Sequence, residues 1–245
     1  SGADGSLIHS KSGAGFGWSV AGGADVNGDG LCDFLTSAPN IGVRVFSGDD
    51  GSLLFSAPGI GGEQFGFGVS TLADMNNDGF GDFLIQIPNR VKLPGGQVVG
   101  AVDIFLGGTN SSFFPTHTTT MPLVNGNQAK VTAISDLDGD GTRDLLVGDP
   151  FAVTNMLFPG IVRIHSGATG ALIDSIDGVN HADAFGTSVA EIGDINNDGF
   201  SDFVVGIPGA NGSGFEFGEA QVFSGADRSV LHTVSGISSL ERFGE

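Results

Sequence analysis

The chain has 245 residues, of which 28 are Asp or Glu and only 9 are Lys or Arg, so its formal net charge is -19. This acidic balance, without a basic stripe or tail, argues against nucleic acid and anionic membranes as partners, and no apolar run approaches the length of a membrane span, about 18 residues. The 43 glycines follow no Gly-X-Y period, which excludes collagen and favours a turn-dense globular fold of short strands.

The first residues, 1–12, are predicted to be the last strand of a preceding repeat. The stretch Ser1-Gly-Ala-Asp-Gly-Ser-Leu-Ile matches the later stretch Ser224-Gly-Ala-Asp-Arg-Ser-Val-Leu, which is typical of a hairpin turn that leads into a strand. The chain is therefore expected to begin inside one repeat.

Residues 13–60 contain one complete repeat. Phe16-Gly17 opens it, a short strand leads into an acidic nonapeptide at 25–33, and an apolar strand follows directly and is stopped by Pro39. Short apolar runs that end at Pro suit strands covered on both faces. A third strand at 43–46, a hairpin turn and a fourth strand complete the repeat, which is thus predicted as four short antiparallel strands.

The same repeat recurs at 61–124, 125–180 and 181–240, and residues 241–245 are predicted to begin another. Phe65-Gly66 and Phe185-Gly186 open the second and fourth copies, whereas the third has Asn127-Gln128 in that place. A four-stranded sheet that cannot bury both faces alone stacks on its copies, as a propeller blade does.

The predicted fold class is therefore all-β: a β-propeller of four-stranded antiparallel blades, with four complete blades and partial blades at both ends. The chain is expected to be a segment of a larger propeller whose further blades belong to the same polypeptide. The alternative is a four-bladed unit that pairs its ends within the chain or with a second copy.

The acidic nonapeptide is the strongest functional signal, because it occurs four times with one design. Side-chain oxygens stand at positions 1, 3, 5 and 9, and a Gly that can turn sharply stands at position 6. Hard cations with six to eight oxygen ligands need such a set. The copies are Asp25-Val-Asn27-Gly-Asp29-Gly-Leu-Cys-Asp33, Asp74-Met-Asn76-Asn-Asp78-Gly-Phe-Gly-Asp82, Asp136-Leu-Asp138-Gly-Asp140-Gly-Thr-Arg-Asp144 and Asp194-Ile-Asn196-Asn-Asp198-Gly-Phe-Ser-Asp202.

Three alternatives to a calcium site can be weighed. An EF-hand needs a Glu at position 12 and flanking helices, but position 12 holds Thr36, Ile85, Val147 or Val205 and the flanks are predicted as strands. Ordinary Asx turns use the same residue types, yet four copies at identical offsets favour a metal. Mg²⁺ prefers few carboxylates and retained waters, which makes it a weaker candidate.

The Phe-Gly opening, the Asp-x-Asn-x-Asp-Gly-x-x-Asp loop and the strand ending such as Ser37-Ala-Pro39 resemble the FG-GAP repeat of integrin α-subunit β-propellers and their bacterial relatives. The resemblance covers essentially the whole chain. It implies that each acidic loop joins the first and second strands of a blade and binds Ca²⁺ on one face of the disc, so that there are four calcium sites. Position 7 would contribute its backbone carbonyl. The implied ligands are Asp25, Asn27, Asp29, Leu31, Asp33, Asp74, Asn76, Asp78, Phe80, Asp82, Asp136, Asp138, Asp140, Thr142, Asp144, Asp194, Asn196, Asp198, Phe200 and Asp202.

The expected function is that of a non-enzymatic, adhesion-type interaction module that binds a protein or glycan. Low-affinity calcium sites are filled outside cells, so the expected location is extracellular or the cell envelope. The loops between second and third strands vary most and are the expected binding region. Their candidate anchors are Arg90, Lys92, Phe151, Met156, Phe158, Phe215 and Phe217.

The alternative is a catalytic or accessory propeller of an extracellular hydrolase. Such an enzyme would need paired carboxylates outside the metal loops. The available acids are Glu63, Asp103, Glu191, Glu216 and Glu219, and they form no motif. His165 stands where other repeats have Phe, and Cys32 is a single cysteine at position 8 of the first loop, so structural roles are expected for both.

Overall fold

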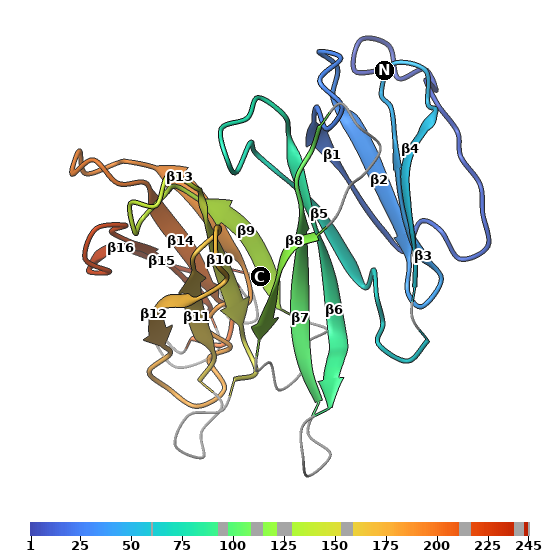
Figure 1. Cartoon of the computed structure of the whole chain (residues 1–245). Coiled ribbons are helices and arrows are strands. Elements are labelled where there is room, and N and C mark those ends of the chain that lie inside the picture. Colours follow the sequence, from blue (N-terminus) through green and yellow to red (C-terminus); the bar gives the residue numbers. More distant parts are fainter. Residues whose placement is uncertain are drawn as a thin grey trace.

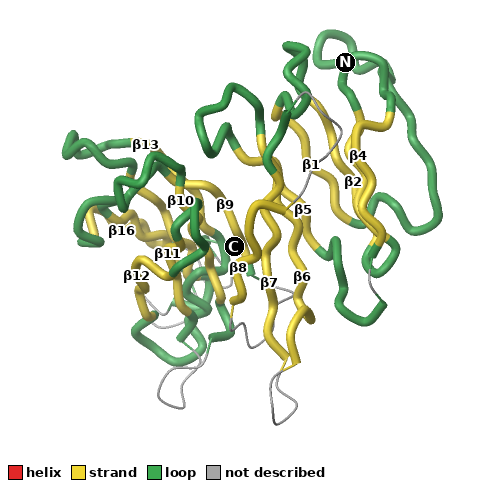
Figure 2. Tube along the Cα trace, viewed as in Figure 1, coloured by secondary structure: helices red, strands yellow, loops and turns green. Residues whose placement is uncertain are grey.

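The structure is a computed structural model, and it describes residues 1–59, 61–92, 98–108, 115–121, 129–152, 159–210, 217–237 and 243–244. This described part forms sixteen strands and no helix, as the strands and loops of Figure 2 show. Accordingly, no helix in it could span a bilayer. The strands are β1 Ser19–Ala24, β2 Asp33–Ala38, β3 Gly42–Phe46, β4 Leu53–Pro58, β5 Gly68–Leu72, β6 Asp82–Lys92, β7 Val98–Phe105, β8 Pro115–Met121, β9 Lys130–Ile134, β10 Asp144–Asp149, β11 Ile161–His165, β12 Leu172–Asp177, β13 Val189–Gly193, β14 Asp202–Ile207, β15 Glu219–Phe223 and β16 Val230–Ser235.

The strands form four antiparallel sheets, each a meander of four consecutive strands. We call β1–β4 the first blade, β5–β8 the second, β9–β12 the third and β13–β16 the fourth. The first strands of successive blades contact one another, β1 with β5, β5 with β9 and β9 with β13. Figure 1 shows the first and fourth blades at opposite sides of the molecule. The predicted all-β propeller architecture of four-stranded blades is confirmed.

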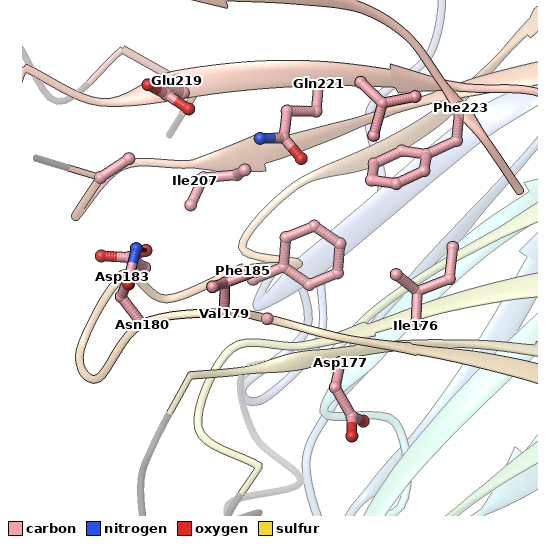
Figure 3. A pocket seen from close by; sticks show the side chains of 13 residues that line it. Ile176, Asp177, Val179, Asn180, Asp183, Phe185, Ile207, Glu219, Gln221 and Phe223 are labelled. Carbon is pink, nitrogen blue, oxygen red and sulfur yellow. Dashed lines mark hydrogen bonds between the residues drawn. The ribbon is translucent and has the colours of Figure 1, made fainter. Parts of the chain in front are cut away.

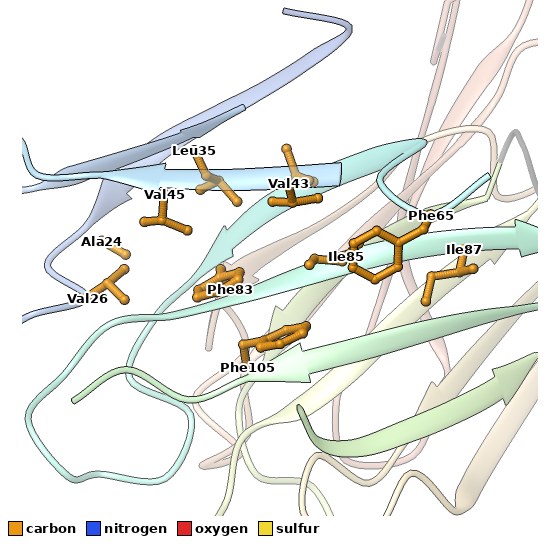
Figure 4. Packing of buried hydrophobic residues seen from close by; sticks show 11 residues of the cluster. Ala24, Val26, Leu35, Val43, Val45, Phe65, Phe83, Ile85, Ile87 and Phe105 are labelled. Carbon is orange, nitrogen blue, oxygen red and sulfur yellow. The ribbon is translucent and has the colours of Figure 1, made fainter. Parts of the chain in front are cut away.

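Apolar side chains fill the spaces between successive blades. Side chains alternate between the two faces of a strand, so that Leu35 of the first blade and Phe83 of the second belong to one cluster (Figure 4). Equivalent clusters join the second blade to the third and the third to the fourth. Strand β10 is buried along its whole length. The prediction that the second strands are covered on both faces therefore holds most fully there.

The Phe-Gly pair has a structural explanation. Phe65 and Phe185 are buried between blades, and the glycine that follows each adopts a left-handed backbone, with φ of 81° at Gly66 and 87° at Gly186. The Gly186 N–H donates to the Gly206 carbonyl at 3.1 Å. A Cβ on Gly148 would collide with the Gly186 carbonyl, because the two chains approach closely there. The motif thus docks the start of one blade on its neighbour.

The C-terminal end of the chain follows the repeat, whereas the N-terminal segment does not form the predicted strand. Phe243 makes the same parallel bridge to Gly218 that Phe185 makes to Gly160. Residues 1–12, in contrast, form no strand in the structure, and their assignment to the last strand of a preceding blade stays a prediction. A strand requires a hydrogen-bonded neighbour, whereas this segment lies along the first blade, with the His9 ring stacked 6.2 Å from that of Phe34. The blade boundaries themselves stay a prediction.

Candidate metal centres

All four acidic nonapeptides connect the first and second strands of their blades, between β1 and β2, β5 and β6, β9 and β10, and β13 and β14. The glycine at position 6 is left-handed in every copy, as the sequence predicted. Its φ is 88° at Gly30, 90° at Gly79, 89° at Gly141 and 95° at Gly199. Position 4 is also left-handed, which explains why only Gly or Asn occurs there. These residues are Gly28, Asn77, Gly139 and Asn197.

The carboxylate at position 1 organises each loop by accepting backbone N–H groups. In the third loop, Asp136 Oδ2 accepts from Gly141 N at 2.8 Å and Oδ1 accepts from Asp140 N at 3.2 Å. The other three loops repeat both bonds through Asp25, Asp74 and Asp194. The loop backbone is therefore wrapped around one carboxylate.

Position 5 links the loop to position 7 and to position 3. The Oδ1 of Asp140 accepts from Thr142 N at 2.8 Å, and the equivalent bond recurs in every copy. Where position 3 is Asn, its amide donates to the position 5 carboxylate, as Asn196 does to Asp198 at 2.7 Å. A carboxylate oxygen has two lone pairs, so one N–H donor leaves capacity for a cation.

The carboxylate at position 9 is the buried member of the set. Asp33, Asp82, Asp144 and Asp202 are at most 1% exposed. One oxygen of each accepts the N–H of position 2, and the other accepts the N–H of a glycine in the turn after the third strand. For Asp144 these donors are Leu137 at 2.8 Å and Gly167 at 3.0 Å. Position 9 thereby ties the acidic loop to the hairpin between the third and fourth strands.

The hairpin residues are a functional element that the sequence reasoning missed. The turn glycines are Gly48, Gly107, Gly167 and Gly225. A Cβ on Gly167 would collide with the Arg143 carbonyl, and a Cβ on each of the other three glycines would also collide with a backbone carbonyl of its loop. In three copies the preceding Ser hydroxyl donates to the position 5 carboxylate, as Ser166 does to Asp140 at 3.1 Å. The sequence feature that could have indicated these contacts is the Ser-Gly pair that starts three of the hairpins.

Burial changes the acidity of position 9. The pKa of Asp82 and of Asp144 is raised to about 6, chiefly by burial; the neighbouring loop carboxylates add to this rise, and the backbone N–H donors oppose it. Burial also raises the pKa of Asp33. A charge held out of water and beside other acids needs a compensating cation. A bound divalent cation would offset both the burial of this carboxylate and its repulsion by the neighbouring carboxylates.

The third loop fits a calcium ion by distance. Ligand oxygens of Asp136, Asp138 and Asp144 all lie within 4.8 Å of one another. Two oxygens bound to one Ca²⁺ at about 2.4 Å each can be separated by up to about 4.8 Å. The other loops have Asn at position 3 and the same hydrogen-bond pattern, so we infer that their oxygens offer a related set with one charge fewer. The structure leaves the implied ligand set and the number of sites as predictions.

The loops are also bonded to one another. Gly81 N of the second loop donates to the Asp25 carbonyl of the first at 2.7 Å, and Arg143 N of the third donates to the Met75 carbonyl of the second at 2.9 Å. Ser201 N of the fourth loop donates to the hydroxyl of Ser135, beside the third loop, at 3.3 Å. A metal held in one loop would thus steady its neighbour.

Calcium affinity is expected to depend on pH between about 5 and 7.5. Because burial raises the folded-state pKa of Asp82 and Asp144 above the unfolded value, the metal-free fold gains stability at low pH and loses it as pH rises through about 6. Ca²⁺ bound beside Asp82 and Asp144 would displace those protons, so its affinity at these two loops should be about tenfold weaker at about pH 5 than at about pH 7.5. Calorimetric titration at both values checks this, and equal affinities would contradict it.

The acids considered for catalysis are engaged elsewhere. Arg90 Nη1 lies 3.7 Å from Glu63 and 3.3 Å from Asp103. Glu191 of the fourth blade pairs with Arg143 of the third. Glu219 accepts a hydrogen bond from Ser235 at 3.3 Å, and Glu216 lies outside the described residues. Most of these carboxylates therefore serve packing between or within blades.

The predicted binding anchors lie in different surroundings, as do His165 and Cys32. Arg90 is paired with acids, so it is not a free anchor, and Phe151 and Phe217 are half-buried. Buried His165 has its Nδ1 3.1 Å from the Gly170 carbonyl, and burial lowers its pKa, which agrees with a structural role. Cys32 is exposed and its thiol donates to the Gly23 carbonyl at 3.4 Å. The side chains of Lys92, Met156, Phe158 and Phe215 lie outside the described part.

Comparison with known proteins points to one kind of repeat. Residues 25–85 match the family described as FG-GAP-like repeat, and residues 185–223 match the FG-GAP repeat. Similar proteins include integrin alpha-3 of Mus musculus, 35% identical over 46% of this chain and 11% of the relative. Integrin alpha-4 of Xenopus laevis is 33% identical over 45% of this chain and 11% of its own length. The chain thus spans about a tenth of the length of these relatives.

A solved structure shares the fold. The crystal structure of BBS1N in complex with ARL6DN, soaked with lead, aligns with a TM-score of 0.50 over 89% of this chain and 58% of that chain. The two sequences are 12% identical, so this likeness concerns architecture alone.

Proposed function

We propose that this chain, whose residues 25–85 and 185–223 match FG-GAP repeats and which is similar to integrin α subunits, is a calcium-stabilised, extracellular β-propeller that acts as a non-enzymatic, adhesion-type module. The observation that carries the proposal is the hydrogen-bond pattern that the four acidic loops share, each anchored by a buried carboxylate. Oxygen donors alone, on turns that hold several carboxylates together, are the ligand chemistry of Ca²⁺.

Calcium in this proposal serves the scaffold. The loops are bonded to one another and to the hairpins of their own blades, so four ions would hold four blades in register. Extracellular modules bind Ca²⁺ with dissociation constants of about 0.1 to 1 mM. Such sites fill outside the cell or in the cell envelope, where we place the protein.

Recognition would use the opposite ends of the strands. The loops that join second and third strands vary in length and composition, and rigid scaffolds usually carry binding residues on such loops. The described acids that might have formed a hydrolase pair are partly neutralised by Arg90 and Arg143. A protein or glycan ligand therefore suits the chain better than a substrate to be cleaved.

The test is binding of the whole chain to arrays of extracellular-matrix proteins and of glycans, in Ca²⁺ and after EDTA. Saturable binding to at least one class, lost in EDTA, is expected. Binding that is unchanged after EDTA would contradict the calcium requirement. Turnover of glycan or ester substrates that Glu191→Gln or Glu219→Gln abolishes would contradict the non-enzymatic assignment.

A further inference from the structure

The first acidic loop contains an asparagine–glycine pair, Asn27-Gly28, that no other acidic loop repeats. In such a pair the glycine nitrogen can attack the side-chain amide carbon of the asparagine, because glycine has no Cβ to hinder the approach. The second and fourth loops have Asn76-Asn77 and Asn196-Asn197 at these positions, and the third has Asp138-Gly139. The first loop is therefore the one in which this attack on an amide meets least hindrance.

The atoms that this reaction uses each have a bonded partner in the loop. The Gly28 N–H donates to Asp25 Oδ1 at 2.7 Å, so a carboxylate is in place to take the proton of the attacking nitrogen. The Asp29 N–H donates to Asn27 Oδ1 at 2.9 Å, and this donor would stabilise charge that develops on that oxygen. The Asn27 amide nitrogen, which would leave as ammonia, donates to Asp29 Oδ2 at 2.9 Å. Asn27 is half-buried and Gly28 is exposed, so water can reach the pair.

The bond from the attacking nitrogen accompanies glycine at position 4. In the third loop Gly139 N donates to Asp136 Oδ1 at 2.7 Å. The second and fourth loops, whose residues the structure describes, show no such bond from the N–H of Asn77 or Asn197, and there the position 1 carboxylate accepts from position 5 instead. The first loop alone thus combines an amide side chain with a base on the neighbouring N–H.

Packing between the loops keeps glycine beside Asn27. A Cβ on Gly28 would collide with the Phe80 ring of the second loop. Gly28 is also left-handed, with φ of 78°, a backbone that residues with a Cβ rarely adopt. Replacing this glycine would therefore cost stability, and the reactive pair is a consequence of how the first two loops pack.

We propose that Asn27 is a site of spontaneous deamidation when the first loop holds no cation; the part of this inference that concerns calcium rests on the proposed function. Gly28 N attacks Asn27 Cγ while its proton passes to the Asp25 carboxylate. The Cγ–Nδ2 bond then breaks, and the amide nitrogen leaves as ammonia with that proton, carried by Asp25 and water. One water molecule opens the resulting five-membered succinimide and leaves an aspartyl or an isoaspartyl residue at this position.

The aspartyl product would have the ligand set of the third loop. That loop carries Asp138-Gly139 at the same positions, and its backbone bonds to Asp136 and Asp140 match those of the first loop. The added carboxylate would strengthen Ca²⁺ binding, because the loop gains one negative charge. The isoaspartyl product lengthens the backbone by one methylene, which would displace the Asp29 N–H and weaken the site.

A cation in the loop would block the reaction. Ca²⁺ would draw the oxygens of Asp25 and Asn27 toward itself. The carboxylate then loses basicity, and the amide is no longer free to turn its carbon toward Gly28 N. Deamidation at this position would therefore record how long the first loop has been without calcium.

The third and fourth blades provide an internal reference for this change. The cavity of about 490 Å³ in Figure 3 is lined by residues of those two blades, among them Phe185, Ile207 and Phe223. Asn196 belongs to the fourth loop, and the first and fourth blades lie at opposite sides of the molecule in Figure 1. A change confined to the first loop should therefore leave both unaltered.

The test is to incubate the whole chain near neutral pH in EDTA and to follow the mass gain of each asparagine-containing peptide by mass spectrometry. Asn27 should convert about tenfold faster, or more, than Asn76 and Asn196. Asp25→Asn keeps an oxygen acceptor for the Gly28 N–H but removes the base, so it should slow the conversion of Asn27 by about tenfold. The comparison of Asn27 with Asn76 and Asn196 within one unaltered chain does not depend on how well this variant folds.

Two further asparagine–glycine pairs serve as matched controls, because they lie outside the acidic loops. These pairs are Asn125-Gly126 and Asn211-Gly212. Their conversion should be the same in Asp25→Asn as in the unaltered chain. Saturating Ca²⁺ should slow Asn27 by about tenfold or more and leave the two control pairs unchanged. Asn27→Asp should show no mass gain at this peptide and should bind Ca²⁺ at the first loop about threefold more tightly.

Equal conversion of Asn27, Asn76 and Asn196 in EDTA, or an unaltered rate in Asp25→Asn, would overturn the proposal. Equal rates in Ca²⁺ and EDTA would also overturn it when calorimetry shows that Ca²⁺ is bound. A parallel change at the control pairs would do the same, since it would report general unfolding. If calorimetry shows no bound Ca²⁺, the proposed calcium role fails, while the rates in EDTA still decide whether Asn27 is a deamidation site.

Discussion

Titrating the metal-free chain with Ca²⁺ is expected to raise its melting temperature as four sites fill. A site at ten times its dissociation constant stabilises the fold by about 1.4 kcal/mol, so four independent sites contribute roughly 6 kcal/mol. For a chain of this size that corresponds to a rise of roughly 10 to 20 °C. Differential scanning calorimetry in about 10 mM Ca²⁺ and in EDTA measures the rise, and an unchanged midpoint would contradict the calcium assignment.

Two variants of the third loop sharpen this result. Asp140→Ala removes a ligand and the acceptor for Thr142 N and the Ser166 hydroxyl, so it should lose one equivalent of Ca²⁺ in calorimetric titration and leave the other three. Asp138→Asn gives the third loop the residue that the other loops carry at position 3, so it should keep all four equivalents. Loss of all metal in Asp140→Ala would show that the sites are not independent.

Replacing Phe203 by Ala is expected to lower the free energy of unfolding by about 3 to 5 kcal/mol. Phe203 is fully buried between the third and fourth blades, where its ring stacks on that of Phe223 with centroids 5.5 Å apart. Removing it opens a cavity that the strands on both sides cannot close. Urea unfolding in saturating Ca²⁺ measures the loss.

The matched control for this variant is Phe34→Ala. Phe34 has the same place in the first blade and a similar stack, 5.4 Å from the Phe46 ring, but it is half-buried and lies under the N-terminal segment. Phe34→Ala should lower the free energy of unfolding by less than half as much as Phe203→Ala does. Equal losses would mean that packing between blades adds little to the stability of each sheet.

Much of the fold could be predicted because each blade is encoded locally and four times. Apolar runs stopped by Pro predicted the second strands, and the structure confirms a strand at each place, although β6 continues past Pro88 to Lys92. This holds even in the third blade, whose opening residues, Asn127 and Gln128, depart from Phe-Gly and lie outside the described part. Residues 1–12 form no strand in the structure, and their assignment to a preceding blade stays a prediction. A match to a hairpin sequence creates a strand only where a neighbouring strand is present to accept its hydrogen bonds.

The candidate site was predictable in part. Positions 1, 3, 5 and 6 act through bonds to N–H groups a few residues away or through their own backbone angle, so the nonapeptide alone specifies them. The left-handed residue at position 4 was missed, although its restriction to Gly or Asn carried the signal. The second acceptor bond of position 9 reaches a glycine 15 to 25 residues further on, and no local pattern shows that contact.

The sequence by itself determined the repeat, the strands and the acidic loops, because turn chemistry and strand periodicity are properties of short segments. Only the tertiary structure decided which carboxylates are buried and which acids face a cation, since these depend on the side chains that a neighbouring strand or blade brings. Glu63 and Asp183 occupy the same place in their repeats, yet Arg90 pairs with the first while Ala210 leaves a cavity beside the second. That difference arises between blades, where packing and charge are set by residues far apart in the chain.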